Sequence, residues 1–92
     1  MSESCRQSFV IPNEKGLHAR ASAKFVEVVE GFDARAEVAK DGMNAGGDSI
    51  MGLLMLAAAR GDTIEVVTDG ADAAPLMEAL AALIDGKFGE EA

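Results

Sequence analysis

Residues 33–45 read DARAEVAKDGMNA, and the pattern in this stretch is typical of a β-hairpin. Apolar residues stand at positions 34, 36 and 38, with charged or small residues between them. This period of two is typical of a half-buried strand, here Asp33–Lys40. Asp41-Gly42 is the strongest short hairpin signal in the chain. We therefore predict that Met43–Ala45 returns antiparallel to the strand before it.

Two more strands are predicted, one on each side of this hairpin. Ser8–Ile11 reads as a short strand that Pro12 ends, because proline cannot donate a hydrogen bond to a neighbouring strand. Thr63–Thr68 reads as another strand, with apolar residues at 64 and 66 on one face. Gly61-Asp62 and Asp69-Gly70 are predicted to turn the chain before and after it.

Three stretches have the spacing of helices. From His18 onward, apolar residues recur on one helical face as far as Gly31, where a helix-ending glycine belongs. Residues 50–55 form a short segment that is apolar nearly all round, and Asp48-Ser49 before it is a good N-cap pair. Residues 73–84 show the clearest 3.6-residue spacing in the chain.

The predicted fold class follows from this order, β-α-β-β-α-β-α. Each strand has one apolar face and the connections are short, so we predict an α+β open-faced β-sandwich. Its four-stranded, mainly antiparallel sheet would carry three helices on one face and water on the other. A chain of 92 residues fits a single domain, 1–92. The ends, residues 1–6 and 89–92, are expected to be mobile.

Composition narrows the range of functions. The net charge is −8, from 16 acidic and 8 basic residues, which argues against nucleic acid and against an anionic membrane surface as partners. The start of the chain has no apolar segment typical of a signal peptide, and no apolar run is long enough to span a bilayer. Cys5 is the only cysteine, so no internal disulfide can form. We expect a cytoplasmic protein without membrane insertion, and nothing demands more than a monomer.

Residues 13–21, NEKGLHARA, hold the only histidine, His18, at the start of the first predicted helix. Free backbone N–H groups and the helix dipole make such an end a site for anions. A neutral imidazole there offers one ring nitrogen as a nucleophile. A phosphoryl group on it would lie over the N–H groups of Ala19 and Arg20, and the Arg20 guanidinium would add charged hydrogen bonds. Gly16 would let the loop turn sharply and keep the approach open.

A more ordinary interpretation competes with this one. A histidine at a helix start is most often a polar cap or a surface residue, and Arg20 could be a solvated helix residue. No histidine and cysteine cluster has zinc-type spacing, and no motif ties a serine to His18 for Ser-His-Asp catalysis. No metal and no cofactor are therefore expected.

Two blocks give the chain a resemblance to a known family. GLHAR at 16–20, followed by Phe25, resembles the active-site motif of HPr, the histidine-containing phosphocarrier of the bacterial phosphoenolpyruvate-dependent phosphotransferase system. DSIMGLLML at 48–56 is similar to the family's regulatory serine and the short helix after it. The resemblance covers about residues 7–88, and the order of elements matches the family's open-faced sandwich.

The resemblance implies a role for each matching residue. His18 matches the histidine that enzyme I phosphorylates at Nδ1, and Arg20 matches the arginine that stabilises the phosphohistidine. Ser49 matches the serine that HPr kinase/phosphorylase modifies in bacteria that have this enzyme. The family's partner-binding apolar patch matches three further residues: Ile50, Met51 and Leu54.

The chain departs from the family pattern at one site position. Ala21 stands where the family usually has proline directly after the arginine. Alanine is a good helix former, so the helix should persist, but its start would be less rigid and the phosphohistidine lifetime could differ. The ending LIDGKFGEE at 83–91 resembles the nitrogen-related branch of the family, NPr, more than the sugar-transport branch.

The resulting functional prediction is a phosphocarrier. It would accept a phosphoryl group from phospho-enzyme I on His18 and pass it to enzyme IIA proteins, as a relay rather than a stand-alone enzyme. One alternative is a regulatory binding module that Ser49 phosphorylation controls, with His18 unused; another is a structural domain without phosphorylation. The pairing of His18 with Arg20 favours the carrier, whereas Ala21 favours its rivals. The acceptor proteins, the sugar or nitrogen branch and the use of Ser49 stay open.

Overall fold

The computed structural model describes residues 3–92. Along the chain its elements are β1 (Glu3–Val10), α1 (Ala19–Glu30), β2 (Arg35–Lys40), β3 (Met43–Gly46), α2 (Ile50–Met55), β4 (Thr63–Gly70), α3 (Ala73–Asp85) and a 3-10 turn at Lys87–Gly89. The predicted order of strands and helices is confirmed.

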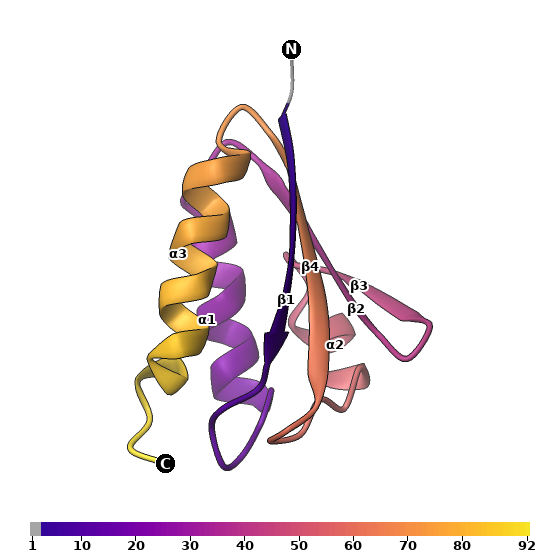
Figure 1. The fold of residues 1–92 in the computed structure, drawn as a ribbon, viewed down its shortest axis with the longest axis vertical. Helices are drawn as coiled ribbons and strands as arrows, with labels where there is room; N and C mark the ends of the chain where they lie inside the picture. The colour runs from indigo at the N-terminus through magenta and orange to yellow at the C-terminus, as the bar shows by residue number, and fades with distance from the viewer. Residues whose placement is uncertain (1–2) are drawn as a thin grey trace.

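The four strands form one sheet in the order β1-β4-β2-β3. Each neighbouring pair is antiparallel. Figure 1 shows α1 and α3 side by side along one face of this sheet. The predicted fold class, an α+β open-faced sandwich, is confirmed.

The predicted hairpin at Asp41-Gly42 is confirmed. Lys40 pairs with Met43 across the turn, so only two residues connect β2 and β3. Asp41 has φ 50° and Gly42 has φ 81°, both in the left-handed region. This is the geometry of a type I′ turn, whose twist matches that of the strands it joins.

Three strand boundaries differ from the sequence prediction by one or two residues: β1 ends at Val10 rather than Ile11, β2 begins at Arg35 rather than Asp33, and β3 ends at Gly46 rather than Ala45. Two larger differences lengthen strands. β1 begins at Glu3 rather than Ser8, and β4 continues through Asp69-Gly70, where the sequence predicts a turn. The two extensions pair with each other, Glu3 with Gly70 at the far end. Polar residues such as 3–6 give no strand pattern of their own, and the backbone hydrogen bonds of a partner strand decide their structure. Residues 1 and 2 of the predicted mobile end lie outside the described residues.

The two faces of the sheet differ in character. The covered face and the helices bury one continuous apolar core, in which α3 packs on β1 and β4 while α1 contacts both α2 and α3. The open face carries ion pairs between neighbouring strands, Arg6 with Glu65 at 2.6 Å and Arg35 with Asp69 at 3.5 Å. The hydrophobic contribution to stability therefore comes from one side of the sheet.

The loop between β1 and α1 is tied to the segment that precedes β4. The amide of Leu17 donates to the carbonyl of Ala58 at 2.9 Å, and the amide of Gly61 donates to the carbonyl of Ile11 at 2.9 Å. Ile11 and Leu17 are both buried. Figure 1 shows this loop and the C-terminus at the same end of the molecule. The start of α1 is thus fixed by contacts outside the helix.

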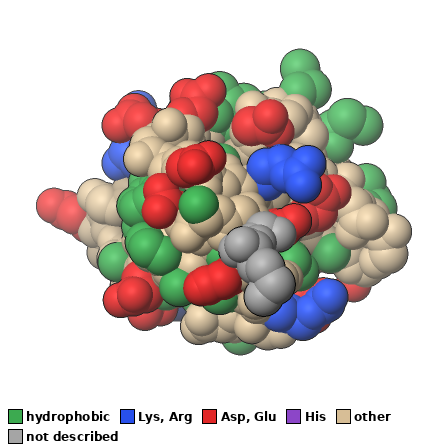
Figure 2. Space-filling view, turned by 90° about the horizontal axis from the view of Figure 1, so that it is seen from above, with side chains coloured by type: hydrophobic (Ala, Val, Ile, Leu, Met, Phe, Trp, Pro, Cys, Tyr) green, Lys and Arg blue, Asp and Glu red, His purple; other side chains and the backbone are tan. Residues whose placement is uncertain are grey.

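The surface agrees with the acidic composition. Figure 2 looks onto the opposite end of the molecule, where acidic side chains are scattered and the basic ones form no continuous patch on the part that the structure describes. Within residues 3–92, no helix combines the length and the apolar sequence that crossing a bilayer requires.

Among the glycines, Gly16 leaves the least room for a side chain. Its φ is +66°, and a Cβ there would stand 2.4 Å from the Ala58 carbonyl oxygen. We expect Gly16→Ala to lower the free energy of unfolding, measured by urea denaturation, by the roughly 1–2 kcal/mol of a left-handed alanine plus a further loss from the backbone clash. Gly42→Ala is the matched control. Gly42 also has positive φ (+81°), but no other atom would lie within 4 Å of a Cβ added there. Equal losses in the two variants would show that the close approach to Ala58 is unimportant.

Candidate functional site

His18 is the N-cap residue of α1. Its backbone is extended, with φ −76° and ψ −177°, and its carbonyl accepts the first hydrogen bond of the helix, from the amide of Ser22 at 2.8 Å. The Ser22 hydroxyl donates to the carbonyl of Leu17 at 3.2 Å and is buried. His18 thus lies at the helix start, as predicted, and the backbone on both sides of the imidazole is held by hydrogen bonds.

The Nδ1 atom of His18 faces the first turn of α1. It accepts a hydrogen bond from the backbone amide of Arg20 at 3.3 Å, the side-chain cap expected at a helix N-terminus. Ala19 and Arg20 occupy the first two helical positions, whose amides have no acceptor within the helix. Nδ1 thus lies where the helix favours negative charge.

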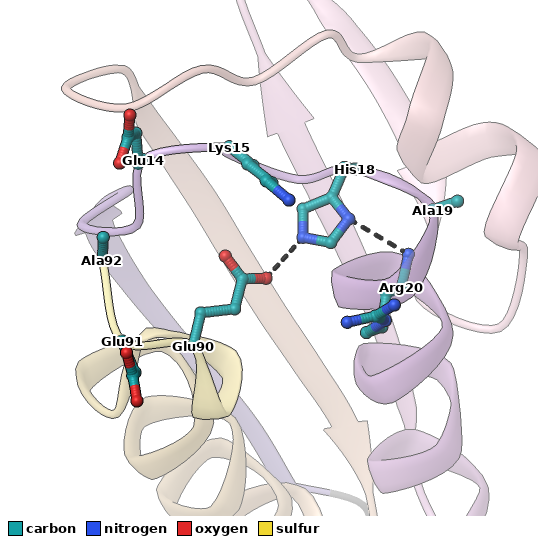
Figure 3. Close-up of a pocket in the computed structure, with 8 residues that line it drawn as sticks. All are labelled: Glu14, Lys15, His18, Ala19, Arg20, Glu90, Glu91 and Ala92. Carbon is teal, nitrogen blue, oxygen red and sulfur yellow. Dashed lines mark hydrogen bonds and ion pairs between the residues drawn. The ribbon is translucent and has the colours of Figure 1, made fainter.

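The other ring nitrogen has a partner from the far end of the chain. The Nε2 atom of His18 forms a hydrogen-bonded pair with Oε2 of Glu90, 72 residues away in sequence (Figure 3). The two side chains are partly buried, with 26% of His18 and 17% of Glu90 exposed. The imidazole is therefore held from both sides, by a local cap and by a distant carboxylate.

The segment after α3 brings Glu90 to this position. Phe88 is fully buried, and its carbonyl accepts a hydrogen bond from Nζ of Lys24 in α1 at 2.6 Å. Lys87, Phe88 and Gly89 all have positive φ, between 55° and 77°. Left-handed conformations cost free energy for residues with a Cβ. Burial of the Phe88 ring and the Lys24 hydrogen bond offset this cost and direct the chain back toward α1.

Asn13 connects the loop before α1 to Glu90. It is fully buried, and its Nδ2 group donates to the Gly16 carbonyl at 2.8 Å and to Oε1 of Glu90 at 3.0 Å. The two oxygens of Glu90 are therefore shared, one bound by Asn13 and the other by His18.

His18 and Glu90 are among the residues that line a hollow of about 560 Å³ (Figure 3). Its lining mixes charges: Glu14, Lys15, His18, Ala19, Arg20, Glu90, Glu91 and Ala92. The Arg20 residue is exposed, and its guanidinium forms no ion pair with any residue in the described part of the chain. Across residues 3–92, no group of three or more His, Cys, Asp or Glu side chains is arranged to hold a metal ion.

The structure brings some of the predicted site residues together and separates others. Ala19 and Arg20 line the hollow beside His18. Gly16 lies in the loop before α1, packed against the Ala58 backbone, and does not line the hollow. Gly16 acts by shaping the loop, which was one of its two predicted roles. Ala21 is buried and α1 still begins at Ala19, so the helix persists without the family's proline.

The second predicted block forms a separate surface on α2. The Ser49 hydroxyl caps this helix by accepting a hydrogen bond from the Gly52 amide at 3.0 Å, as predicted. Ile50 is 41% exposed and Met51 is 68% exposed, while Leu54 is half-buried. None of these residues lines the hollow at His18.

Sequence reasoning missed Glu90 and Asn13. The tail 89–92 was assigned no role, and its predicted mobility stays a prediction, but the structure gives Glu90 defined partners. Glu90 lies in an acidic ending, and such endings are usually solvated, so the pattern carried no sign of a contact. Asn13 looked like an ordinary loop residue, and only its complete burial reveals its function as a donor.

The environment of Glu90 changes its acidity. The hydrogen bond with His18 lowers the pKa of the Glu90 carboxyl below its usual value, and this effect outweighs partial burial, which raises it. The hydrogen bond from Asn13 and the positive charge of Lys15 lower it further. Glu90 is therefore a carboxylate acceptor at neutral pH.

Comparisons with known proteins agree with this fold. The family model described as "PTS HPr component phosphorylation site" matches residues 5–86. A phosphocarrier protein HPr from Neisseria meningitidis is 53% identical over 92% of this chain and 96% of its own length. A phosphocarrier protein NPr from Shewanella violacea is 40% identical over 87% of this chain and 88% of its own length. The crystal structure of an HPr from Thermoanaerobacter tengcongensis is similar with a TM-score of 0.91 and 35% identity, covering 96% of this chain and 99% of that one.

The fold, a histidine at the start of α1 and these matches define a class of small phosphocarrier domains. The chain belongs to the HPr family, the phosphocarrier proteins of the phosphotransferase system. Proteins named HPr and proteins named NPr are both among its relatives.

The acidity of Glu90 gives a prediction for the contact with His18. We expect side-chain carbon NMR to place the pKa of Glu90 below the usual glutamate range, and His18→Ala to move it upward. Because the folded-state pKa is lowered, the contact stabilises the fold above the usual glutamate pKa, and this contribution is lost as pH falls through the lowered value. A Glu90 pKa that does not respond to His18→Ala would contradict the contact.

Proposed function

We propose that this protein carries a phosphoryl group on Nδ1 of His18, which it takes from phospho-enzyme I and delivers to enzyme IIA proteins. In the first step the Nδ1 lone pair attacks the phosphorus of the donor. The Nδ1–P bond forms as the bond from phosphorus to the donor atom breaks, and the donor atom keeps that electron pair. Delivery to an acceptor reverses these roles. Membership of the family supports the carrier function.

One observation carries the assignment to Nδ1. The Nδ1 atom of His18 lies against the Arg20 amide at the N-terminus of α1, while Nε2 is engaged by Glu90. Once Nδ1 bonds to phosphorus, the Arg20 amide is released and can donate to a phosphoryl oxygen instead. The group would then lie over the first turn of α1, where backbone amides favour an anion.

Arg20 has a separate role in this proposal. Its guanidinium is exposed beside His18 and has no carboxylate partner among residues 3–92, so no ion pair must break before it binds a phosphoryl oxygen. Arginine gives directional, charged hydrogen bonds to phosphate. Together with the amides of Ala19 and Arg20 it would lengthen the life of the phosphohistidine.

The proposed partners imply where in the cell this protein acts. Enzyme I and the IIA proteins would meet this chain in the cytoplasm, where we expect the carrier to act as a monomer. Proteins named HPr and proteins named NPr are both similar to this chain. The sugar-transport branch and the nitrogen-related branch are therefore both candidate pathways.

The test is the intact mass after incubation with phosphoenolpyruvate, Mg²⁺ and catalytic enzyme I. We expect wild type to gain one acid-labile phosphoryl group and His18→Ala to gain none. A gain in His18→Ala, or no gain in wild type with its cognate enzyme I, would overturn the carrier function and leave the serine-controlled binding module as the leading alternative.

The same assay tests Arg20. We expect Arg20→Gln to accept the phosphoryl group and then lose it roughly tenfold to hundredfold faster than wild type, because one charged hydrogen bond contributes about 1.5–3 kcal/mol. Arg60→Gln is the matched control, since Arg60 is also exposed but does not line the hollow. Equal phosphohistidine lifetimes in the two variants would contradict the proposed role of Arg20 in stabilising the phosphohistidine.

We further propose that α2 provides the docking surface, with Ser49 as its point of control. Ile50 and Met51 expose apolar side chains next to Ser49, and a surface of this kind suits a protein partner. A phosphate on Ser49, added by an HPr kinase/phosphorylase, would place a dianion beside this surface. It would weaken the binding of apolar or acidic partner surfaces.

A pair of variants separates the charge at Ser49 from its capping role. Asp and Asn are both good N-cap residues, so Ser49→Asp and Ser49→Asn should both keep α2 while only the first adds charge. We expect Ser49→Asp to raise the dissociation constant for enzyme I about threefold to tenfold relative to Ser49→Asn, measured by calorimetry. Equal constants would exclude electrostatic control at this residue.

A further inference from the structure

We propose that Glu90, oriented by Asn13, is a positioning residue that holds His18 in the tautomer with its proton on Nε2 and its lone pair on Nδ1. The effect on phosphoryl transfer rests on the proposed carrier function, whereas the contacts that select the tautomer do not. It assigns a role to the C-terminal segment, which lies 72 residues from the histidine.

The hydrogen bonds of the imidazole select one tautomer. Nδ1 of His18 faces the N–H of Arg20, so Nδ1 must be the acceptor. Nε2 faces a carboxylate oxygen of Glu90, so Nε2 must be the donor. A proton moved from Nε2 to Nδ1 would set two donors against each other at Arg20 and two acceptors at Glu90. A neutral histidine satisfies both contacts in only one arrangement.

Asn13 fixes the orientation of the carboxylate. Its Nδ2 group supplies two hydrogens, one to the Gly16 carbonyl and one to Oε1 of Glu90. Turning the amide over would place its oxygen against both of these acceptors, so the orientation is determined by the partners. Because Asn13 is fully buried, the arrangement is rigid, and it leaves Oε2 of Glu90 directed at His18.

The backbone before Glu90 is built to hold this contact. Lys87 and Phe88 take left-handed conformations that residues with a Cβ rarely adopt. The buried Phe88 ring and the hydrogen bond from Lys24 hold the segment against α1. Backbone of this kind persists only where the surrounding contacts determine it, and its result here is the placement of Glu90.

The consequence for transfer concerns the charge on the ring. When Nδ1 attacks phosphorus, its lone pair becomes the new N–P bond and the ring gains positive charge while Nε2 still carries its proton. The carboxylate of Glu90 lies against that proton and stabilises the charge as it develops. The proton stays in the Nε2–Glu90 hydrogen bond throughout. On delivery the N–P bond breaks and its electrons return to Nδ1.

The contrary possibility is that the tail obstructs the site. Glu14, Glu90 and Glu91 all line the hollow, and their charges oppose an incoming phosphoryl group. However, Glu90 contacts Nε2 and leaves Nδ1 to the helix terminus, so the nucleophilic side of the ring is not covered by this carboxylate. Positioning and obstruction predict opposite effects of removing Glu90.

The first experiment measures the tautomer itself, without any phosphoryl donor. Nitrogen NMR of the His18 ring in the full-length protein should show Nε2–H in wild type. We expect Glu90→Ala to lower the ratio of the Nε2–H to the Nδ1–H form about tenfold, the effect of one charged hydrogen bond. Glu91→Ala removes the same charge from the adjacent residue, which also lines the hollow, and should leave the ratio unchanged. An unchanged ratio in Glu90→Ala would overturn the inference.

The second experiment measures the rate of phosphorylation by phosphoenolpyruvate, Mg²⁺ and enzyme I. We expect Glu90→Ala to slow it about tenfold at saturating carrier. Glu78→Ala is the control, because Glu78 is exposed and does not line the hollow, and it should leave the rate near wild type. A faster rate in Glu90→Ala would identify the tail as an obstruction and overturn the positioning role. Failure of wild type to be phosphorylated would instead sink the carrier function, while the tautomer result would stand by itself.

Discussion

The hydrogen bond from the Leu17 amide to the Ala58 carbonyl is the constraint on which the site depends. It joins the loop before α1 to the segment before β4, and it forms because Gly16 can adopt positive φ and approach that carbonyl closely. With Leu17 buried and its backbone held, the next residue becomes the N-cap of α1. The position of the His18 imidazole is therefore set by contacts of the neighbouring Leu17, and the ring itself takes no part in them.

The site then combines two kinds of interaction with different origins. The Arg20 amide belongs to the same helix as its acceptor on His18, so this contact forms whenever α1 does. The Glu90 contact requires that α3 packs on the sheet, that Phe88 is buried and that the chain turns back toward α1. The imidazole is thus held by a local cap at Nδ1 and by a long-range contact at Nε2.

Charge is distributed in keeping with such a carrier. The chain is acidic overall, with 16 acidic and 8 basic residues, and the hollow brings Lys15 and Arg20 together with three glutamates, Glu14, Glu90 and Glu91. The apolar residues exposed on α2 do not line that hollow. Under the proposed function, chemistry and recognition would therefore use different surfaces, and a charge on Ser49 would act on the second.

The sequence by itself determined whatever depends on neighbouring residues. The alternation in β2, the turn at Asp41-Gly42 and the caps at His18 and Ser49 follow local rules, and all are present in the structure. Only the tertiary structure decided the full length of β1 and β4 and the partners of the imidazole. Asn13 and Glu90 are 77 residues apart, and no periodicity links such positions. Their contact exists because helices and strands pack into one core, which brings the two ends of the chain together.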